Sequence, residues 1–315
     1  MGQVNDNRAL IKYLSPCSDS PLVSVCIPTF NATRWISDCL NSALAQSYRH
    51  LEILVVDDAS SDGTSELVRS FKDERIRLIV NERNLGLAAN WNRCVRLSRG
   101  YFIKFLFQDD ILYPACIEKM TRLLLDHDNV GLVFSARDIM IEGDTGKAVT
   151  DDWLRGCRTL HTKFDVLREV NRGRELFCQH LRKGFRGNWV GEPSSVMIKR
   201  DCFQCLGLFN ERLAQLCDLE MWLRVMFFYD IGFIEEKLSA FRFHANSASM
   251  ANIQSGRNWL DYLRLLDGLL SYGEIKASHP ELIKLRRSEL FRIIVRLIVP
   301  LSVRRGLLPA RSSAG

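Results

Sequence analysis

The feature that most constrains the fold is a regular alternation of short apolar runs and amphipathic stretches between Leu22 and Ala136. The apolar runs, each bounded by turn residues, predict strands over Leu22–Ile27, Leu51–Val56, Arg75–Val80, Tyr101–Phe107 and Val130–Ser135. The amphipathic stretches between them predict helices over Thr33–Gln46, Asp62–Phe71, Leu87–Ser98 and Pro114–Asp126. Strands that alternate with helices of this length indicate βαβ units, and therefore an α/β fold with a mostly parallel, Rossmann-like sheet flanked by helices.

Beyond residue 137 the pattern is looser. It predicts a helix over Asn171–Arg182, a strand over Ser195–Lys199, a helix over Leu219–Phe228, an extended segment over Gly232–Phe243 and a helical tail from Asn258. We therefore expect one α/β domain over residues 21–250. A polar N-terminal segment (1–20) precedes it, and a helical, basic C-terminal extension (251–315) follows it.

Composition excludes several classes of protein. Hydrophobic residues make up 47% and charged residues 25% of the 315 residues, an ordinary balance for a globular enzyme. Cys202 and Cys205 have the spacing of half a zinc site, but no second pair follows, and the other cysteines do not suggest a disulfide framework. The N-terminus lacks the apolar core of a signal peptide, and no run is long enough to span a bilayer. We expect a cytoplasmic protein.

Two acidic pairs, Asp57-Asp58 and Asp109-Asp110, directly follow predicted strands. In an open α/β sheet, ligands bind beyond the carboxyl ends of the strands. Magnesium and manganese prefer carboxylate and phosphate oxygens, so these pairs could hold a metal ion and a nucleotide. Asp109 or Asp110 could instead begin the helix that follows. Asp62 is the expected N-cap of its helix, which leaves Asp57 and Asp58 without an obvious structural role.

Three further side chains are chemical candidates. Asp218 and Glu220 begin a predicted helix, where acidic residues are also favoured by the helix dipole. Asp218 could act as a general base that removes a proton from an attacking hydroxyl. His244 follows the extended segment, and its neutral imidazole could reach a metal or a phosphate, although a surface histidine is equally consistent with its position.

Taken in order, these motifs resemble those of the inverting, nucleotide-sugar-dependent glycosyltransferases of family 2, whose catalytic domain has the GT-A fold. The matching segments are Val23–Asn31, Leu54–Thr64, Asn84–Asn92 and Gly100–Asp110, and the similarity reappears at Asp218–Arg224 and Arg242–Ser249. The resemblance implies a nucleotide-binding half over residues 21–136 and an acceptor half over residues 137–250. It also implies a nucleoside-diphosphate sugar donor and a saccharide acceptor.

The resemblance assigns individual roles. It places Pro28, Thr29 and Asp58 in the nucleotide pocket, with Asp109 beside them. Asp109 and Asp110 match the acidic motif that binds Mg²⁺ or Mn²⁺ in the family, and Asp110 is the expected direct ligand.

On the same basis, His244 lies near the metal and the diphosphate, and Asp218 is the catalytic base of a single displacement that inverts the anomeric carbon. Glu220 and Arg242 are expected to contact the acceptor or the diphosphate. Many family members carry another aspartate where this chain has Phe107, so the ligand shell departs from the family pattern.

The C-terminal extension carries eight Lys and Arg against one acid, Glu289, between residues 284 and 311. Over Ser288–Val303, the residues Glu289, Arg292 and Arg296 line one helical stripe, and apolar residues fill most of the rest. Such a helix could lie in a membrane interface or pack against the catalytic domain or a partner subunit. The membrane alternative indicates a lipid-linked saccharide acceptor, as in bacterial surface polysaccharide synthesis at the inner face of the cell membrane. We expect no nucleic-acid partner.

Two other functions compete with this one. A metal-dependent nucleotidyltransferase would require a glycine-rich loop after the first strand, and Pro28–Asn31 does not provide one. A non-catalytic sugar-nucleotide or glycan-binding protein on the same scaffold would be expected to have lost some of its acidic residues, yet Asp58, Asp109, Asp110 and Asp218 are all present.

Overall fold

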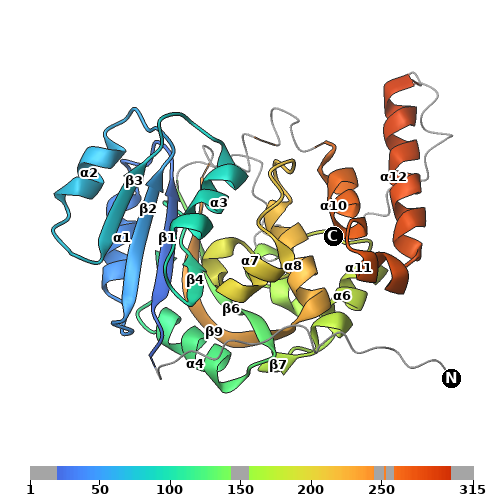
Figure 1. Cartoon of the computed structure of the whole chain (residues 1–315), viewed down its shortest axis with the longest axis horizontal. Coiled ribbons are helices and arrows are strands. Elements are labelled where there is room, and N and C mark those ends of the chain that lie inside the picture. The colour runs from blue at the N-terminus through green and yellow to red at the C-terminus, as the bar shows by residue number, and fades with distance from the viewer. Residues whose placement is uncertain (1–19, 143–155, 245–251, 253–258, 299–315) are drawn as a thin grey trace.

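The computed structural model describes residues 20–142, 156–244, 252 and 259–298. These residues form one nine-stranded sheet with the order β3-β2-β1-β4-β8-β6-β9-β5, and β7 pairs with β9 outside this path (Figure 1). The strands are β1 (Val23–Thr29), β2 (Leu51–Asp57), β3 (Ile76–Val80), β4 (Phe102–Phe105), β5 (Ile111–Leu112), β6 (Val130–Ile141), β7 (Val170–Asn171), β8 (Val196–Lys199) and β9 (Asp230–Phe243).

The first half of the domain follows the expected βαβ pattern. Strands β3, β2, β1 and β4 are parallel, and the helices between them are α1 (Ile36–Leu44), α2 (Thr64–Ser70) and α3 (Leu87–Leu97). Helix α4 (Cys116–Asp126) leads into β6. The mostly parallel α/β sheet predicted from the sequence is confirmed. The short strand β5, which pairs antiparallel with β9, was not predicted.

The second half is more irregular. Strand β8 is antiparallel to both β4 and β6, whereas β6 and β9 are parallel. The helices here are α6 (Gly173–Arg182), α7 (Arg200–Leu206) and α8 (Cys217–Phe228), with short 3₁₀ turns η3 (Leu160–Lys163) and η4 (Pro193–Ser195). Helix α7 was not predicted, and β6 continues six residues past the expected end at Ser135.

Alternation along the strands builds a core on each face of the sheet. In β2, Leu54 and Val56 join the core under α3 and α8, whereas Ile53 and Val55 join the core under α1 and α4. Successive strand side chains point to opposite faces, so a continuous apolar run is buried on both sides.

Strand register gathers the polar ends of β1, β2 and β4 at one edge. Thr29 at the end of β1 pairs with Asp57 at the end of β2, and Cys26 pairs with Phe105 at the end of β4. The residues that follow each strand therefore meet beyond the same edge, as expected for a parallel sheet.

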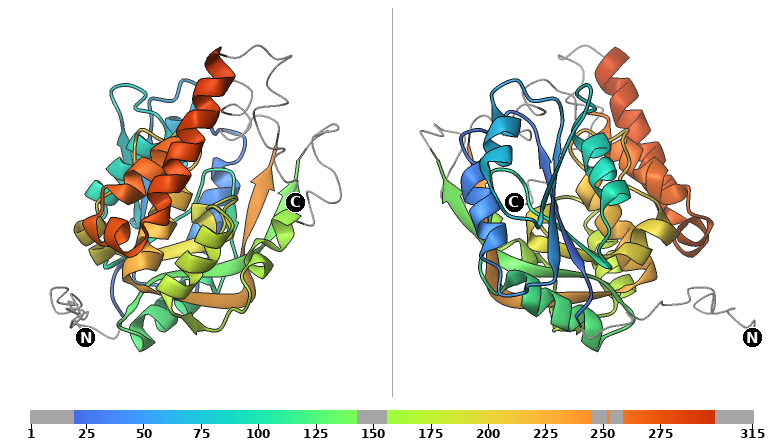
Figure 2. Two further views of the ribbon diagram at one scale, coloured as in Figure 1. Left: turned by 90° about the vertical axis from the view of Figure 1, so that its right-hand side faces the viewer. Right: turned by 60° about the vertical axis from the view of Figure 1, so that its left-hand side comes forward.

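The C-terminal extension consists of α10 (Asp261–Leu270), α11 (Gly273–Ser278) and α12 (Glu281–Ile298), which lie across the molecule from α1 and α2 (Figure 2). Leu265, Leu266 and Leu269 of α10 are fully buried in the same core as α8. Within the described ranges, no helix has the length and apolar content needed to cross a membrane.

Helix α12 is oriented differently from what its sequence suggested. Glu289, part of the expected polar stripe, is buried with Ile293. Leu290, Phe291 and Ile294 are 36%, 55% and 43% exposed. The helix thus packs on the body through one face and presents an apolar patch on another. Residues 299–315, which complete the predicted basic segment, lie outside the described residues.

Asp261, at the start of α10, connects this extension to α8. Its buried carboxylate accepts hydrogen bonds from the backbone N–H groups of Ala214, Gln215 and Leu216 at 3.1, 2.5 and 3.2 Å. These N–H groups precede α8 and have no carbonyl partner within that helix, so a carboxylate from another helix satisfies them.

We predict that Asp261→Ala lowers the free energy of unfolding by about 2–3 kcal/mol, because buried N–H groups lose a charged acceptor. The measurement is urea unfolding. Asp267→Ala is the matched control on the same helix, since it removes only a partly exposed ion pair with Arg286, worth under about 1 kcal/mol. Equal losses in the two variants would contradict the special role of Asp261.

Candidate active site

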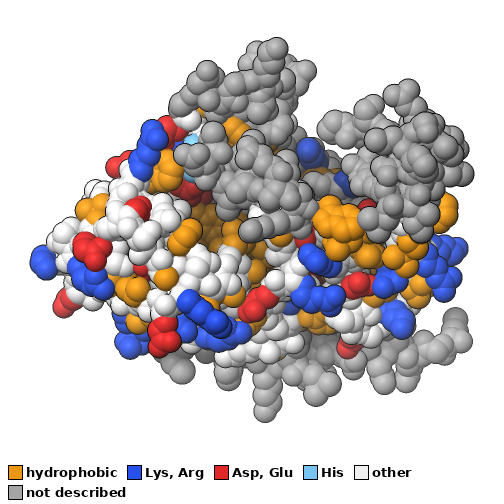
Figure 3. Space-filling model, turned by 90° about the horizontal axis from the view of Figure 1, so that it is seen from above, with side chains coloured by type: hydrophobic (Ala, Val, Ile, Leu, Met, Phe, Trp, Pro, Cys, Tyr) orange, Lys and Arg blue, Asp and Glu red, His pale blue; other side chains and the backbone are white. Residues whose placement is uncertain are grey.

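A cavity of about 860 Å³ lies beyond the carboxyl edge of the sheet, on the face of the molecule shown in Figure 3. Both halves of the domain line it, from Pro28, Thr29 and Asp58 in the first half to Asn188, Glu192, Asp218 and His244 in the second. Its volume is within the range of pockets that bind small molecules and cofactors.

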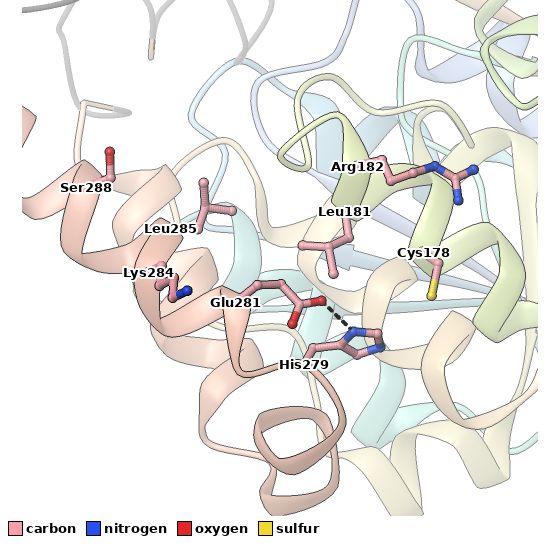
Figure 4. A pocket seen from close by; sticks show the side chains of 8 residues that line it. All are labelled: Cys178, Leu181, Arg182, His279, Glu281, Lys284, Leu285 and Ser288. Carbon is pink, nitrogen blue, oxygen red and sulfur yellow. Dashed lines mark hydrogen bonds and ion pairs between the residues drawn. The ribbon is translucent and has the colours of Figure 1, made fainter.

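A second cavity, of about 510 Å³, lies between α6 and α12 (Figure 4). It is lined by Cys178, Leu181, Arg182, His279, Glu281, Lys284, Leu285 and Ser288. Its walls are mainly apolar, and none of the site residues expected from the sequence reaches it. The larger cavity is therefore the candidate active site.

Asp58 lies at the nucleotide end of the larger cavity and is almost fully buried. Its carboxylate accepts hydrogen bonds from Asn81 Nδ2 (2.7 Å) and from the backbone N–H groups of Leu85 (2.8 Å) and Gly86 (2.9 Å). Gly86 adopts φ +90°, a conformation that favours glycine. Asp58 thereby fixes the loop before α3, whose residues line the same cavity.

Asp57 has a structural role as well, contrary to the sequence-based interpretation. Its carboxylate accepts hydrogen bonds from the Ser60 backbone N–H (3.1 Å), the Ser60 hydroxyl and the Ser65 hydroxyl (2.8 Å). These bonds close the turn between β2 and α2. The paired acids at this strand end therefore serve two different loops.

The second acidic pair divides its roles in a way that the sequence did not indicate. Asp110 is fully buried and does not line the cavity. Its carboxylate accepts hydrogen bonds from the Ser194 hydroxyl (2.5 Å) and the Arg242 backbone N–H (2.9 Å). Burial and the neighbouring Asp109 carboxylate raise the pKa of Asp110 well above its usual range. The expectation that Asp110 is the direct metal ligand is corrected, because Asp109 is the one that faces the cavity.

Asp109 and His244 meet in the wall of the cavity. Asp109 Oδ2 lies 2.9 Å from His244 Nε2, and the imidazole ring packs against Trp35 with 4.2 Å between ring centroids. His244 Nδ1 is buried without a hydrogen-bond partner in the described part of the chain. A carboxylate beside an imidazole can supply two ligands to a divalent cation, although no group of three or more such side chains occurs among the described residues.

Arg242 supports this pair from outside the cavity. Its Nε donates a hydrogen bond to the Asp109 carbonyl at 2.8 Å, and its Nη1 donates one to Glu142 Oε2 at 3.1 Å. It does not line the cavity. The expectation that Arg242 contacts the acceptor or the diphosphate is therefore corrected, because its guanidinium is used to hold the backbone of the acidic turn.

Glu220 is also placed differently from the expectation. It is buried and forms an ion pair with Arg224, with Oε2 2.8 Å from Nη2. A Cβ atom added at Gly268 of α10 would come within 2.8 Å of Glu220 Oε1. Glu220 thus faces the C-terminal extension and not the cavity, which corrects its assignment to the acceptor or diphosphate.

Asp218, in the first turn of α8, faces the cavity. Its carboxylate accepts hydrogen bonds from the Leu219 backbone N–H (2.6 Å) and from Asn188 Nδ2 (3.0 Å). Burial, reinforced by the charge of Glu192, raises the pKa of Asp218 to about 7. A carboxyl group with a pKa near 7 is partly ionised at physiological pH, and its carboxylate is a stronger base than an ordinary aspartate.

Asn188 and Glu192 were missed by the sequence analysis. They lie in the loop before β8, where Asn188 stands between two glycines with positive φ, Gly187 and Gly191, and Glu192 directly follows the second. A loop has no hydrophobic period, so its glycine-rich, polar composition was the only available signal. Asn252, which also lines the cavity, donates a hydrogen bond to the Ala214 carbonyl at 2.8 Å and belongs to the segment expected as a separate extension.

The comparisons with known proteins agree with this geometry. Residues 24–187 match the family model described as glycosyl transferase family 2. An uncharacterized protein of Mycobacterium tuberculosis (strain CDC 1551 / Oshkosh) is 36% identical over 250 residues, which cover 79% of this chain and 76% of that protein. An uncharacterized glycosyltransferase of Rickettsia felis is 31% identical over 73% of this chain, and the match spans only 35% of its own length.

A third relative is the putative teichuronic acid biosynthesis glycosyltransferase TuaG of Bacillus subtilis. It is 33% identical over 127 residues, which cover 40% of this chain and 50% of TuaG.

Two solved structures have the same fold at low sequence identity. Residues 1–349 of TarS from S. aureus, in complex with UDP-GlcNAc, superpose with a TM-score of 0.64 at 15% identity, covering 90% of this chain and 77% of that one. The mannosyltransferase PcManGT from Pyrobaculum calidifontis, in complex with GDP-Man and Mn²⁺, gives a TM-score of 0.56 at 17% identity, covering 91% and 78%. The chain therefore belongs to glycosyl transferase family 2 and has the GT-A fold.

Proposed function

We propose that the protein transfers a sugar from a nucleoside-diphosphate sugar to a hydroxyl group of a saccharide acceptor, with inversion at the anomeric carbon. The observation that carries this proposal is the shared cavity. An acidic residue with a pKa of about 7, Asp218, lines the same cavity as the Asp109–His244 pair and the polar end of the sheet.

The donor nucleotide would occupy the end of the cavity formed by Pro28, Thr29 and the loop that Asp58 fixes. Asn84, Gly86 and Trp91 complete this end. The complexes of TarS with UDP-GlcNAc and of PcManGT with GDP-Man support a nucleotide sugar as the donor.

A divalent cation, Mg²⁺ or Mn²⁺, fits beside Asp109 and His244. The fit rests on the carboxylate and imidazole in contact, because both are suitable ligands and phosphate oxygens would complete the shell. When bound, the ion would neutralise charge on the departing diphosphate. The Mn²⁺ in the PcManGT complex supports this assignment.

Asp218 would remove the proton from the acceptor hydroxyl as its oxygen attacks the anomeric carbon. A single displacement with one base inverts the configuration at that carbon. Its hydrogen bonds with Leu219 and Asn188 orient the carboxylate before the acceptor arrives, so little reorganisation is required.

The acceptor is proposed to be lipid-linked, in bacterial surface polysaccharide synthesis at the inner face of the cell membrane. The exposed patch of Leu290, Phe291 and Ile294 on α12 supports a membrane contact, and Lys284 and Arg287 lie exposed on the same helix. Helix α12 projects from the body on the side of the carboxyl end of β1, where the cavity lies (Figure 1). The name of TuaG refers to a surface polymer, which supports the same acceptor class.

We predict that Asp218→Asn lowers kcat by about 10²–10⁴-fold, because general-base catalysis is lost. Donor affinity should change less than about twofold, since Asp218 is proposed to act on the acceptor hydroxyl and not to bind the donor. Release of nucleoside diphosphate from UDP-GlcNAc and GDP-Man measures turnover, and calorimetry measures affinity. Asp201→Asn, in the first turn of α7 and away from the cavity, is the matched control. Full turnover by Asp218→Asn would remove Asp218 from this role.

The wild-type enzyme should lose activity as the pH falls through about 7, the pKa of Asp218. The base acts only when ionised, so kcat should fall by about tenfold per pH unit well below this value. A pH profile of kcat from 5 to 9 measures the acid limb. A flat profile across this range would contradict a base with a raised pKa.

We predict that Asp109→Asn and His244→Ala weaken the Mn²⁺-dependent part of UDP binding by at least about tenfold, because each removes one ligand. Calorimetry with Mn²⁺ and with EDTA measures this part directly. His50→Ala is the control, since His50 precedes β2 at the opposite edge of the sheet. Unchanged Mn²⁺ dependence in both variants would show that the metal ion is not bound by Asp109 and His244.

The full chain should sediment with vesicles that contain phosphatidylglycerol, and Phe291→Glu with Ile294→Glu should abolish this, because charges replace the exposed apolar patch. Val166→Glu is the control, because Val166 is 66% exposed but lies far from α12 in sequence. If the wild-type chain stays in the supernatant, the membrane contact is wrong.

A further inference from the structure

The loop over residues 188–193 forms part of the cavity wall. One of its side chains has no role in the reaction proposed above. Asn188 folds this loop. Its Oδ1 accepts hydrogen bonds from the backbone N–H groups of Val190 (3.2 Å) and Gly191 (3.0 Å), and its Nδ2 donates one to the Gly191 carbonyl at 2.8 Å. The same Nδ2 donates to Asp218 Oδ2 at 3.0 Å. One amide therefore closes the loop and holds the base.

A second interaction attaches the loop to α8. Trp222, one helical turn after Asp218, donates a hydrogen bond from Nε1 to the Gly191 carbonyl at 3.1 Å. Gly191 has φ +104°, and a Cβ atom there would lie 2.9 Å from the Ser195 hydroxyl oxygen. Only glycine suits this position, so the geometry of the loop relative to Asp218 is fixed by the backbone.

Glu192 extends from this loop into the cavity wall. Its Oε1 forms an ion pair with Arg137 Nε, and the two side chains are only 14% and 5% exposed. Arg137 in turn donates a hydrogen bond from Nη1 to the Cys157 carbonyl at 3.0 Å. Oε1 is buried and has no hydrogen-bond partner besides this ion pair, and no hydrogen bond to Oε2 is found among the residues that the structure describes. One oxygen is thus committed to Arg137, and the other remains for a ligand.

Two carboxylates, Asp218 and Glu192, therefore share one wall of the cavity. A carboxylate accepts hydrogen bonds and repels other anions. Arg137, which does not itself line the cavity, is paired with Glu192 behind the wall. The chemistry of the wall favours a ligand that brings hydroxyl donors and no negative charge.

On the basis of the proposed function, we infer that Glu192 is a specificity-determining residue for the acceptor. Its Oε2 accepts a hydrogen bond from the hydroxyl adjacent to the one that Asp218 deprotonates. The acceptor ring is therefore a neutral sugar with two neighbouring free hydroxyls. During transfer, the attacking oxygen gives its proton to Asp218 and bonds to the anomeric carbon, whose bond to the nucleoside diphosphate breaks.

The binding test uses saturation-transfer NMR with methyl β-D-glucopyranoside and methyl β-D-glucopyranosiduronate, in the presence of UDP and Mn²⁺. The wild type should bind the neutral glucoside about tenfold or more tightly than the glucuronide, because the carboxylates of Glu192 and Asp218 repel the additional carboxylate of the glucuronide. Glu192→Gln should weaken glucoside binding by about tenfold and reduce the preference to near unity.

Glu192→Asp separates charge from reach. It keeps the negative charge beside Arg137 but withdraws the oxygen by one methylene group. The variant should retain discrimination against the glucuronide while losing affinity for the glucoside. Glu52→Gln is the matched control, because Glu52 also pairs with an arginine, Arg77, and does not line the cavity. An unchanged preference in Glu192→Gln, or no glucoside binding by the wild type, would overturn the proposal.

A kinetic readout distinguishes this role from a purely structural one. The charge of Glu192 adds to the burial that raises the pKa of Asp218, so Glu192→Gln should move the acid limb of kcat to lower pH, and Glu192→Asp should not. Cys217, the titratable residue next to Asp218 on α8, is changed by neither variant. The donor KM should stay within about twofold of the wild type.

The two proposals can fail separately. Binding of the glucosides does not require turnover, so a protein that releases no nucleoside diphosphate would still report the role of Glu192 through the NMR preference. Conversely, turnover with an unmoved acid limb and an unmoved preference in Glu192→Gln would refute the role of Glu192 and leave the glycosyltransferase proposal standing.

Discussion

Buried carboxylates that accept hydrogen bonds from distant loops are the interaction on which the site depends. A buried polar group is costly unless it is hydrogen-bonded, so the buried carboxyl groups of Asp58 and Asp110 hold their loops through several hydrogen bonds each. Asp58 fixes the loop before α3 through the N–H groups of Leu85 and Gly86. Asp110 joins the turn after β4 to β9 through the N–H of Arg242. These bonds position Asp109 and the loop before α3, both of which line the cavity.

The acceptor side follows the same principle with a different set of elements. Asn188 and Trp222 hold the loop that precedes β8 against α8, and Asp261 of the C-terminal extension satisfies the N–H groups in front of α8. Asp218 is therefore positioned from both sides. The C-terminal extension therefore supports the cavity together with the sheet. If α12 contacts a membrane, α10 and α8 connect that contact to the proposed acceptor end of the cavity.

The sequence predicted the first half of the domain well because its signals are local. Apolar runs and helix periodicity between Leu22 and Ala136 arise from burial on two faces of a parallel sheet. The second half was predicted less completely, since β5 is two residues long and the loop carrying Glu192 has no period. The inward orientation of Glu289 was not predictable from helical periodicity, because that pattern expects an acidic side chain to face solvent, whereas here Glu289 is buried and pairs with the partly exposed Arg292.

The sequence by itself determined the fold class, the family, and the edge at which Asp58 and Asp109 meet, because the register of parallel strands follows from their order and length. Only the tertiary structure decided which member of each acidic pair faces the cavity. At the turn after β4, the Ser194 hydroxyl and the Arg242 backbone N–H each bind one oxygen of the Asp110 carboxylate and hold it inward, whereas Asp109 contacts His244. Those partners come from residues more than eighty positions away, and no local pattern records them.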